Sequence, residues 1–122
     1  DETLGCGGTL LKHKEAGDQL NWLILSQMKE DQGYDADRIA RRNREIQRVS
    51  DGYCFNSVNI APFSTMELDR YPKKELVDFI VSVVRTISPE IIYIPFPGDV
   101  HSDHLAVYEA SQPKRCCRRE SR

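Results

Sequence analysis

PKKELVDFIVSVVRTISPEIIYIPF, residues 72–96, is the stretch that decides the fold class. Its first part carries apolar residues at spacings of four, three, one and three, which is the pattern of one helix face. These residues are Leu76, Ile80, Val83, Val84 and Ile87. Pro72 opens the helix and Pro89 closes it, and the apolar run EIIYIPF, residues 90–96, follows with the pattern of a strand buried on both faces. The stretch therefore predicts a helix that leads directly into a buried strand.

The same alternation of helices and apolar runs extends toward the N-terminus. Strands are expected over residues 20–28 and 57–63, and helices over residues 3–16 and 37–50. Continuously apolar strands that alternate with helices imply right-handed βαβ units. We therefore predict an α/β fold in which helices cover both faces of a mostly parallel sheet.

The composition is that of one ordinary soluble domain. The chain has 122 residues, of which 39% are hydrophobic and 30% charged, and its formal net charge is −2, which argues against nucleic-acid binding. Its apolar runs are far shorter than the roughly 20 residues of a membrane-spanning helix, and it shows no leader. The four cysteines form no CxxC pair. We expect a cytoplasmic protein without a disulfide framework.

The C-terminal residues differ in character from the rest of the chain. Apolar periodicity stops after Ala110, and SQPKRCCRRESR, residues 111–122, is rich in basic residues. We therefore expect one domain over residues 1–110, followed by a disordered basic tail.

GDVHSDH, residues 98–104, is the first candidate site because it follows the predicted strand 90–96, and open parallel sheets bind ligands at the carboxyl ends of their strands. Imidazole and carboxylate groups are good zinc ligands, and a catalytic zinc site keeps three protein ligands and a water. His101 and His104 would face one cavity if a helix starts near Asp103. In the alternative interpretation, Ser102 or Asp103 caps that helix and both histidines face solvent.

Three other features have simpler interpretations. GCGG, residues 5–8, opens a helix, where glycines bind phosphate in some proteins, but it lacks the GxGxxG spacing, and packing against the sheet explains the glycines better. RIARRNRE, residues 38–45, mixes arginines with acidic residues as a solvated helix face does. His13 is expected on the surface, and Met66 is expected to serve only in packing.

The motifs DETLGCGGTL, RNRE and PFPGDVHSDHLAVYEA together resemble the LmbE-like, or PIG-L, family of zinc-dependent N-deacetylases. The resemblance covers most of residues 1–110. It implies a Rossmann-like three-layer sandwich with a mostly parallel sheet, whose first strand is missing from this sequence. It also implies hydrolysis of the acetyl group from an N-acetylated sugar, such as an N-acetylglucosamine derivative.

The resemblance implies that Asp1 and His104 are zinc ligands. Asp1 matches the second aspartate of the family's opening motif AHPDDE, and His104 matches the second histidine of HxDH. The AHPD that holds another ligand and the general base does not precede Asp1 in this sequence. We therefore interpret the chain as a fragment that by itself binds zinc weakly and is inactive.

The resemblance also assigns roles to four residues around the metal. His101 matches the family's general acid, and Asp103 matches the aspartate that orients and tunes that histidine. Arg42 matches a substrate-contacting arginine of some relatives, and Asp99 is expected to line the same pocket.

Two other functions remain open at this point. One is a non-catalytic phosphate- or nucleotide-binding module, and the other is a protein-interaction module that recruits an acidic partner through the basic tail. An unpaired sheet edge left by a missing first strand would favour a homo-oligomer. For the deacetylase, the expected partner is a small N-acetylated sugar, with no nucleic acid and no membrane span.

Overall fold

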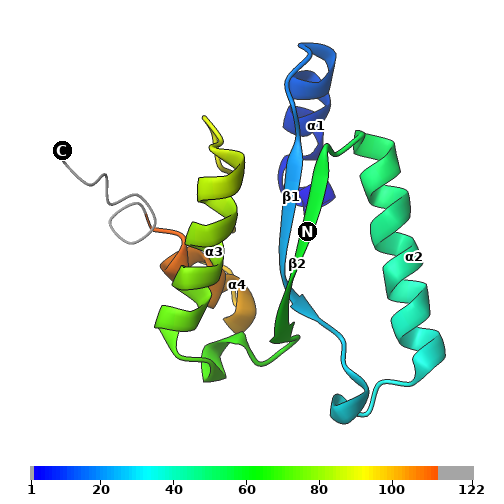
Figure 1. The fold of residues 1–122 in the computed structure, drawn as a ribbon, viewed down its shortest axis with the longest axis vertical. Coiled ribbons are helices and arrows are strands. Elements are labelled where there is room, and N and C mark those ends of the chain that lie inside the picture. The colour runs from blue at the N-terminus through cyan, green and yellow to red at the C-terminus, as the bar shows by residue number, and fades with distance from the viewer. Residues whose placement is uncertain (1, 113–122) are drawn as a thin grey trace.

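A computed structural model describes residues 2–112 of the chain (Figure 1). In chain order the elements are α1 (Glu2–Glu15), β1 (Asn21–Gln27), the 3-10 helix η1 (Glu30–Gln32), α2 (Ala36–Tyr53), β2 (Ser57–Ser64), the 3-10 helix η2 (Leu68–Arg70), α3 (Lys73–Ile87) and α4 (Ser102–Ala110). None of the described helices is long and apolar enough to cross a membrane. From residue 113 onward, the predicted basic tail lies outside the described residues.

The two strands form a parallel pair, as the sequence predicted. Asn21 of β1 is opposite Ser57 of β2, and the register shifts once, between Ile24 and Ser26. The connection between the strands passes through α2, which is the βαβ arrangement expected for a parallel pair. The α/β fold class is therefore confirmed.

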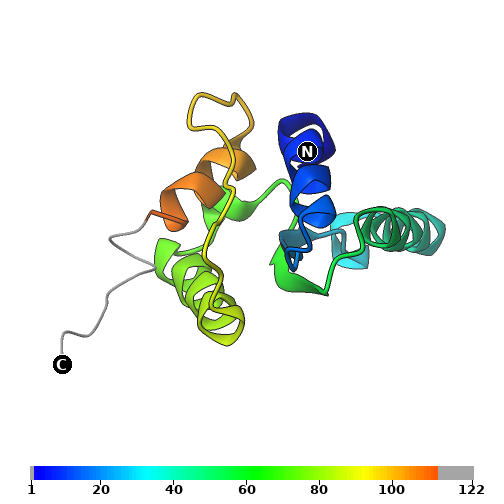
Figure 2. The same ribbon diagram turned by 90° about the horizontal axis from the view of Figure 1, so that it is seen from above.

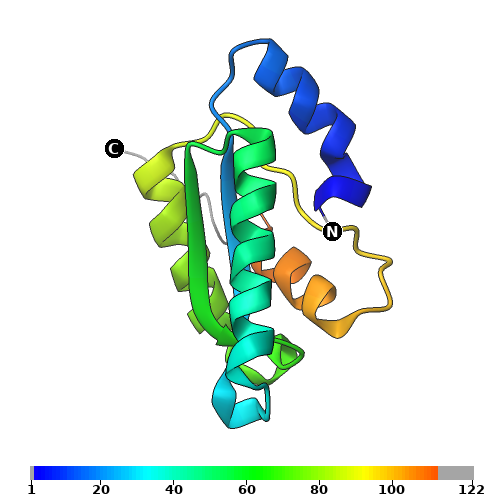
Figure 3. The same ribbon diagram turned by 90° about the vertical axis from the view of Figure 1, so that its right-hand side faces the viewer.

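The helices cover both faces of this sheet. Figures 1 and 2 show α2 on one side of β1 and β2, and α3 and α4 on the other. Figure 3 shows the same three layers from the side, with α2 in front of the strands and α3 behind them. This order places α4, which begins within the HxDH motif, on the α3 side of the sheet.

The main hydrophobic core lies between the sheet, α3 and α4. The apolar face predicted for α3 is confirmed, since Leu76 and Ile80 are buried in this core. They pack in a cluster with Leu25, Ala61, Phe63, Leu68 and Ala110. Full burial of one large aliphatic side chain stabilises a fold by about 1.5–3 kcal/mol, so this cluster fixes α3 and α4 against the strands.

The helices begin and end close to the predicted positions. Asp35 caps α2, since its Oδ1 accepts a hydrogen bond from the backbone N–H of Arg38 at 2.7 Å. The helix continues beyond the expected residue 50 to Tyr53, and Cys54 ends it in the left-handed conformation with φ of 54°. Tyr53 then packs with Leu10 and Leu20 in a second, smaller core cluster.

Close packing explains neither Gly5 nor Gly8, both of which are exposed, whereas Gly7 is buried. A Cβ atom built at Gly5 or Gly8 would meet no atom within 4 Å, so neither glycine is required by close packing. Helix α1 is instead interrupted at Cys6, whose φ of −146° is not helical. The glycines lie within α1 and not in a loop that leads into it.

The predicted buried strand over residues 90–96 is also wrong. This segment belongs to no strand, and its apolar side chains are exposed, with Ile91 at 59% and Phe96 at 73% of full exposure. In the described chain the sheet consists of β1 and β2 alone, and residues 90–96 pair with neither of them. The segment is held instead by Tyr93, whose hydroxyl lies 2.8 Å from Nε2 of His13.

His13 is therefore not the exposed surface residue that we expected. Its side chain is 24% exposed, and Nδ1 lies 2.6 Å from a carboxylate oxygen of Asp18. The other ring nitrogen, Nε2, forms a hydrogen bond with the Tyr93 hydroxyl, so His13 connects residues 90–96 to α1. Figure 3 shows the segment between α3 and α4 passing beside α1 on its way to α4.

Candidate functional site

The candidate site lies at the start of α4, where His101 is the N-cap residue. The backbone of His101 is extended, with φ of −80° and ψ of 120°, and its Nδ1 accepts a hydrogen bond from the backbone N–H of Asp103 at 3.2 Å. The alternative that Ser102 or Asp103 caps this helix is therefore wrong. Because the cap uses Nδ1, the ring of His101 presents Nε2 to its surroundings.

The two histidines of the motif lie together, as the sequence predicted. The rings of His101 and His104 stack with centroids 4.8 Å apart and planes inclined by 24°. Helical geometry brings residues three apart to one face of α4, and the cap places His101 one turn above His104. This pair of rings is the chemical centre of the site.

Asp99, in the loop before α4, forms hydrogen bonds with both histidines. One of its carboxylate oxygens lies 2.7 Å from Nδ1 of His104, and the other accepts a hydrogen bond from the backbone N–H of His101 at 2.9 Å. The hydrogen bond from His104 is the main cause that lowers the pKa of the Asp99 carboxyl, and the backbone bond adds to it. Because Nδ1 of His104 is committed to Asp99, a metal ion would be bound through Nε2.

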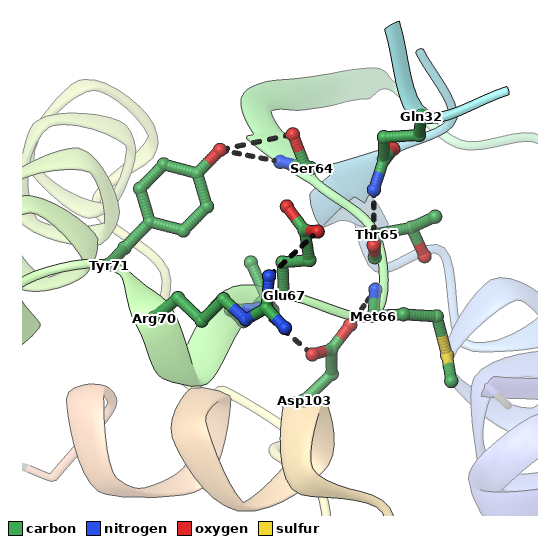
Figure 4. Close-up of polar contacts among 9 residues, drawn as sticks. Gln32, Ser64, Thr65, Met66, Glu67, Arg70, Tyr71 and Asp103 are labelled. Carbon is green, nitrogen blue, oxygen red and sulfur yellow. Dashed lines mark hydrogen bonds and ion pairs between the residues drawn. The ribbon is translucent and has the colours of Figure 1, made fainter. Parts of the chain in front are cut away.

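Asp103 has a different partner from the one expected. Its buried carboxylate accepts hydrogen bonds from the backbone N–H groups of Met66, at 2.7 Å, and Leu68, at 3.0 Å (Figure 4). Its contact with His101 runs through its own backbone N–H. Asp103 therefore orients His101 through the helix cap, while its carboxylate joins α4 to the end of β2.

The end of β2 is held from other sides as well. The Tyr71 hydroxyl accepts a hydrogen bond from the backbone N–H of Ser64 at 3.0 Å and donates to its Oγ at 3.1 Å. Gln32 donates from Nε2 to the carbonyl oxygen of Thr65 at 2.9 Å (Figure 4). Residues 64–68 are thus a rigid wall of the site.

Met66 is a site residue that sequence reasoning missed. Its Sδ lies 3.2 Å from Nε2 of His101, and its side chain is largely exposed rather than packed in the core. The interpretation of Met66 as a packing residue is therefore wrong. The available signal was its position two residues after β2, at the carboxyl end of a parallel strand.

Arg42 lies in a different part of the molecule. It lines a small pocket of about 60 Å³ between α2 and the sheet, together with Ser26, Gln27 and Met28 at the end of β1. A larger cavity of about 480 Å³ continues along the same face beside Gln47 and Val58. Among the described contacts, none joins Arg42 to His101 or His104, so the structure does not bring these three residues together.

The described residues do not by themselves complete a metal site. Within residues 2–112 no three histidine, cysteine, aspartate or glutamate side chains converge as ligands, whereas a catalytic zinc needs three. His104 is the candidate ligand within that range, and the expected ligand Asp1 lies outside it. The arrangement at α4 therefore supplies part of a ligand set and an adjacent imidazole.

Comparisons with known proteins agree with this architecture. The family model described as PIG-L, GlcNAc-PI de-N-acetylase, matches residues 1–113. The crystal structure of the conserved protein TT1542 from Thermus thermophilus is similar to this fold, with a TM-score of 0.72 and 25% sequence identity. The match covers 90% of this chain and 48% of that one, so this chain spans about half the length of its structural relative. No curated protein matches the chain. Because the family model covers nearly all of the sequence, the chain belongs to the PIG-L family of GlcNAc-PI de-N-acetylases.

Proposed function

We propose that this chain supplies half of the active site of a zinc-dependent N-deacetylase that hydrolyses the acetyl amide of a small N-acetylglucosamine-type substrate. Membership of the PIG-L family supports the reaction class. The observation that carries the assignment to particular residues is the stacked pair His101 and His104, with Asp99 bonded to Nδ1 of His104. A cytoplasmic location is part of the proposal, because the cysteines follow no disulfide pattern.

In this proposal His104 is a metal ligand and Asp99 is its outer partner. A carboxylate bonded to one ring nitrogen fixes the tautomer and orientation of a histidine that binds metal through the other nitrogen. The distance of 2.7 Å between Asp99 and His104 fits that role. Asp1 would be a second ligand, as the family motif implies. When bound, zinc would polarise the amide carbonyl and lower the pKa of a bound water.

His101 would supply the proton that amide hydrolysis needs. When the carbon–nitrogen bond of the amide breaks, the nitrogen must leave as an amine, so an acid has to protonate it. The Nε2 atom of His101 is the ring nitrogen that faces away from the helix cap, since Nδ1 accepts from Asp103. To act as the acid, the ring would take up a second proton on Nδ1 in place of the hydrogen bond from Asp103. The charged ring would then stabilise a neighbouring oxyanion, pass its Nε2 proton to the leaving nitrogen and become neutral again.

Zinc titration by calorimetry tests the ligand assignment on the chain itself. With fewer than three ligands in the described residues, the chain should bind zinc weakly, and His104→Ala should abolish what binding remains. The control is His13→Ala, because His13 is bonded to Asp18 and Tyr93 outside the site. Zinc binding that survives His104→Ala but not His13→Ala would contradict the assignment.

A further inference from the structure

Met66 holds a backbone conformation that its position in the fold does not explain. Its φ of 62° is in the left-handed region, which costs about 1–2 kcal/mol for a residue with a side chain. Cys54 and Ser88 share this conformation, but each of them ends a helix, where the left-handed conformation is common. Met66 follows a strand. Strain of this kind persists only where the surroundings impose it, and it gathers at functional sites.

Hydrogen bonds with Asp103 of α4 impose the left-handed conformation on Met66. The backbone N–H of Met66 donates to Oδ2 of Asp103 at 2.7 Å, and Oδ1 of the same buried carboxylate accepts from Leu68. On the other side, the backbone N–H of Thr65 donates to the carbonyl oxygen of Gln27 at 3.0 Å. These bonds fix the backbone on both sides of the Met66 Cα and direct its side chain away from the core, where it is 61% exposed.

The thioether of Met66 contacts one atom of the His101 ring. Sδ of Met66 lies 3.2 Å from Nε2 of His101. Because Nδ1 of His101 accepts the Asp103 N–H, the neutral ring carries its proton on Nε2, and a thioether sulfur is a weak acceptor for that proton. Met66 therefore covers the same ring atom that the proposed reaction uses.

We propose that Met66 is a positioning residue for His101, which holds the ring in its Nε2–H form and shields that atom until an N-acyl substrate displaces the thioether. An amide carbonyl or a developing amine is a stronger acceptor than sulfur, so a bound substrate replaces the Met66 contact, whereas the apolar side chain keeps bulk water away. The use of His101 as an acid rests on the proposed deacetylase function. The contact between Met66 and His101 does not.

Chemical modification of the histidines tests this shield on the intact chain without zinc or substrate. Diethyl pyrocarbonate acylates accessible imidazole nitrogens, and peptide mass spectrometry gives a separate rate for each of His13, His101 and His104. Met66→Gly removes the side chain and accepts the positive φ without strain. We expect it to raise the His101 rate several-fold while the His13 rate stays unchanged.

Two further variants separate shielding from a change in folding. Met66→Asn tolerates the left-handed backbone and leaves a shorter side chain, so it should also raise the His101 rate. Met66→Leu restores an apolar side chain of similar size and should return the rate close to that of the native chain. Equal His101 rates in the native chain and both shortened variants would overturn the proposal. A rise in all three histidine rates together would also overturn it, because that pattern reports general loosening of the fold.

The outcome is independent of the proposed function. If the deacetylase assignment fails, the modification rates still show whether Met66 covers His101, because no turnover is measured. If the shield fails, His101 and His104 keep their proposed roles and only the role of Met66 is lost.

Discussion

A buried carboxylate oxygen of Asp103 lies 2.7 Å from the backbone nitrogen of Met66, and this bond joins the first turn of α4 to the end of β2. The second carboxylate oxygen accepts a hydrogen bond from the backbone N–H of Leu68, a residue that is buried in the core. His101 and the wall formed by residues 64–68 are therefore fixed relative to each other by one side chain. A site built on rigid elements in this way keeps its reacting groups in place without rearrangement.

Replacing Asp103 should destabilise the fold as well as the site. Asp103→Ala leaves the backbone N–H groups of Met66 and Leu68 without their acceptor and should lower the free energy of unfolding by roughly 2–4 kcal/mol. Asp103→Asn keeps one acceptor oxygen and should cost about half as much. Urea unfolding followed by circular dichroism measures both changes. Asp31→Asn, an exposed carboxylate in η1, serves as control, and an equal effect of the two Asp103 variants and this control would contradict the account.

Leu76 should be a main contributor to the core that supports the site. It is 2% exposed in the cluster between α3, α4 and the sheet, so Leu76→Ala leaves a cavity and should cost about 2–5 kcal/mol. Leu11→Ala, on the exposed side of α1, is the matched control and should change stability by no more than about 0.5 kcal/mol. Thermal unfolding of the two variants measures the loss of stability in each. Similar losses in Leu76→Ala and Leu11→Ala would show that α3 is not packed as described.

The Tyr71 phenol should ionise at a lower pH than an ordinary tyrosine. The hydrogen bond with the Ser64 side chain, and then that with the Ser64 backbone N–H, lowers the pKa of Tyr71 below its usual 10.0. A lowered folded-state pKa makes the phenolate a stabilising group whose contribution is complete above 10.0 and is lost as the pH falls through the folded value. The free energy of unfolding of the native chain should thus rise with pH, relative to Tyr71→Phe, across that window.

The difference in near-ultraviolet absorbance between the native chain and Tyr71→Phe measures this ionisation directly. Ser64→Ala removes the hydroxyl that contributes most to lowering the pKa of Tyr71, so the midpoint of the Tyr71 titration should move back toward 10.0. A midpoint at or above 10.0 in the native chain would show that the end of β2 is not held by Tyr71 as the structure has it.

The exposed apolar segment 90–96 should make the isolated chain associate. Ile91, Ile92 and Phe96 are each at least half exposed, and exposed apolar surface of this kind favours association between copies. Sedimentation should show an average mass that rises with protein concentration. Ile92→Lys with Phe96→Ser should reduce this association, whereas Leu4→Lys, an exposed change on α1, should leave it unaltered. A monomer at all concentrations would contradict the homo-oligomer that we propose.

Local pattern was sufficient to predict most of the elements. The helix face of α3, the two paired strands and the helix at the HxDH motif all depend on periodicity, on prolines or on caps within a few residues of each other. The segment 90–96 has the same apolar pattern as β1 and β2, yet it forms no strand here. Whether an apolar run becomes a strand depends on a neighbouring strand, which local sequence does not specify.

The site was predictable only in part for the same reason. His101 and His104 are three residues apart on one helix, so their proximity follows from the sequence. The partners of Asp103 and His101 at the end of β2 lie 37 and 35 residues away in the sequence, and only the packing of α4 on the sheet brings them together. The position of Arg42 across the sheet from α4 is likewise a property of the layers rather than of the motif.

Acetate release by a variant that carries the family motif AHPD in front of Asp1 is the most decisive test of the deacetylase assignment. N-acetylglucosamine derivatives are the substrates in this assay. We expect zinc-dependent release that is abolished by His104→Ala and strongly reduced by His101→Gln, with His13→Gln as the active control. Release that persists in both His101→Gln and His104→Ala would contradict the assignment.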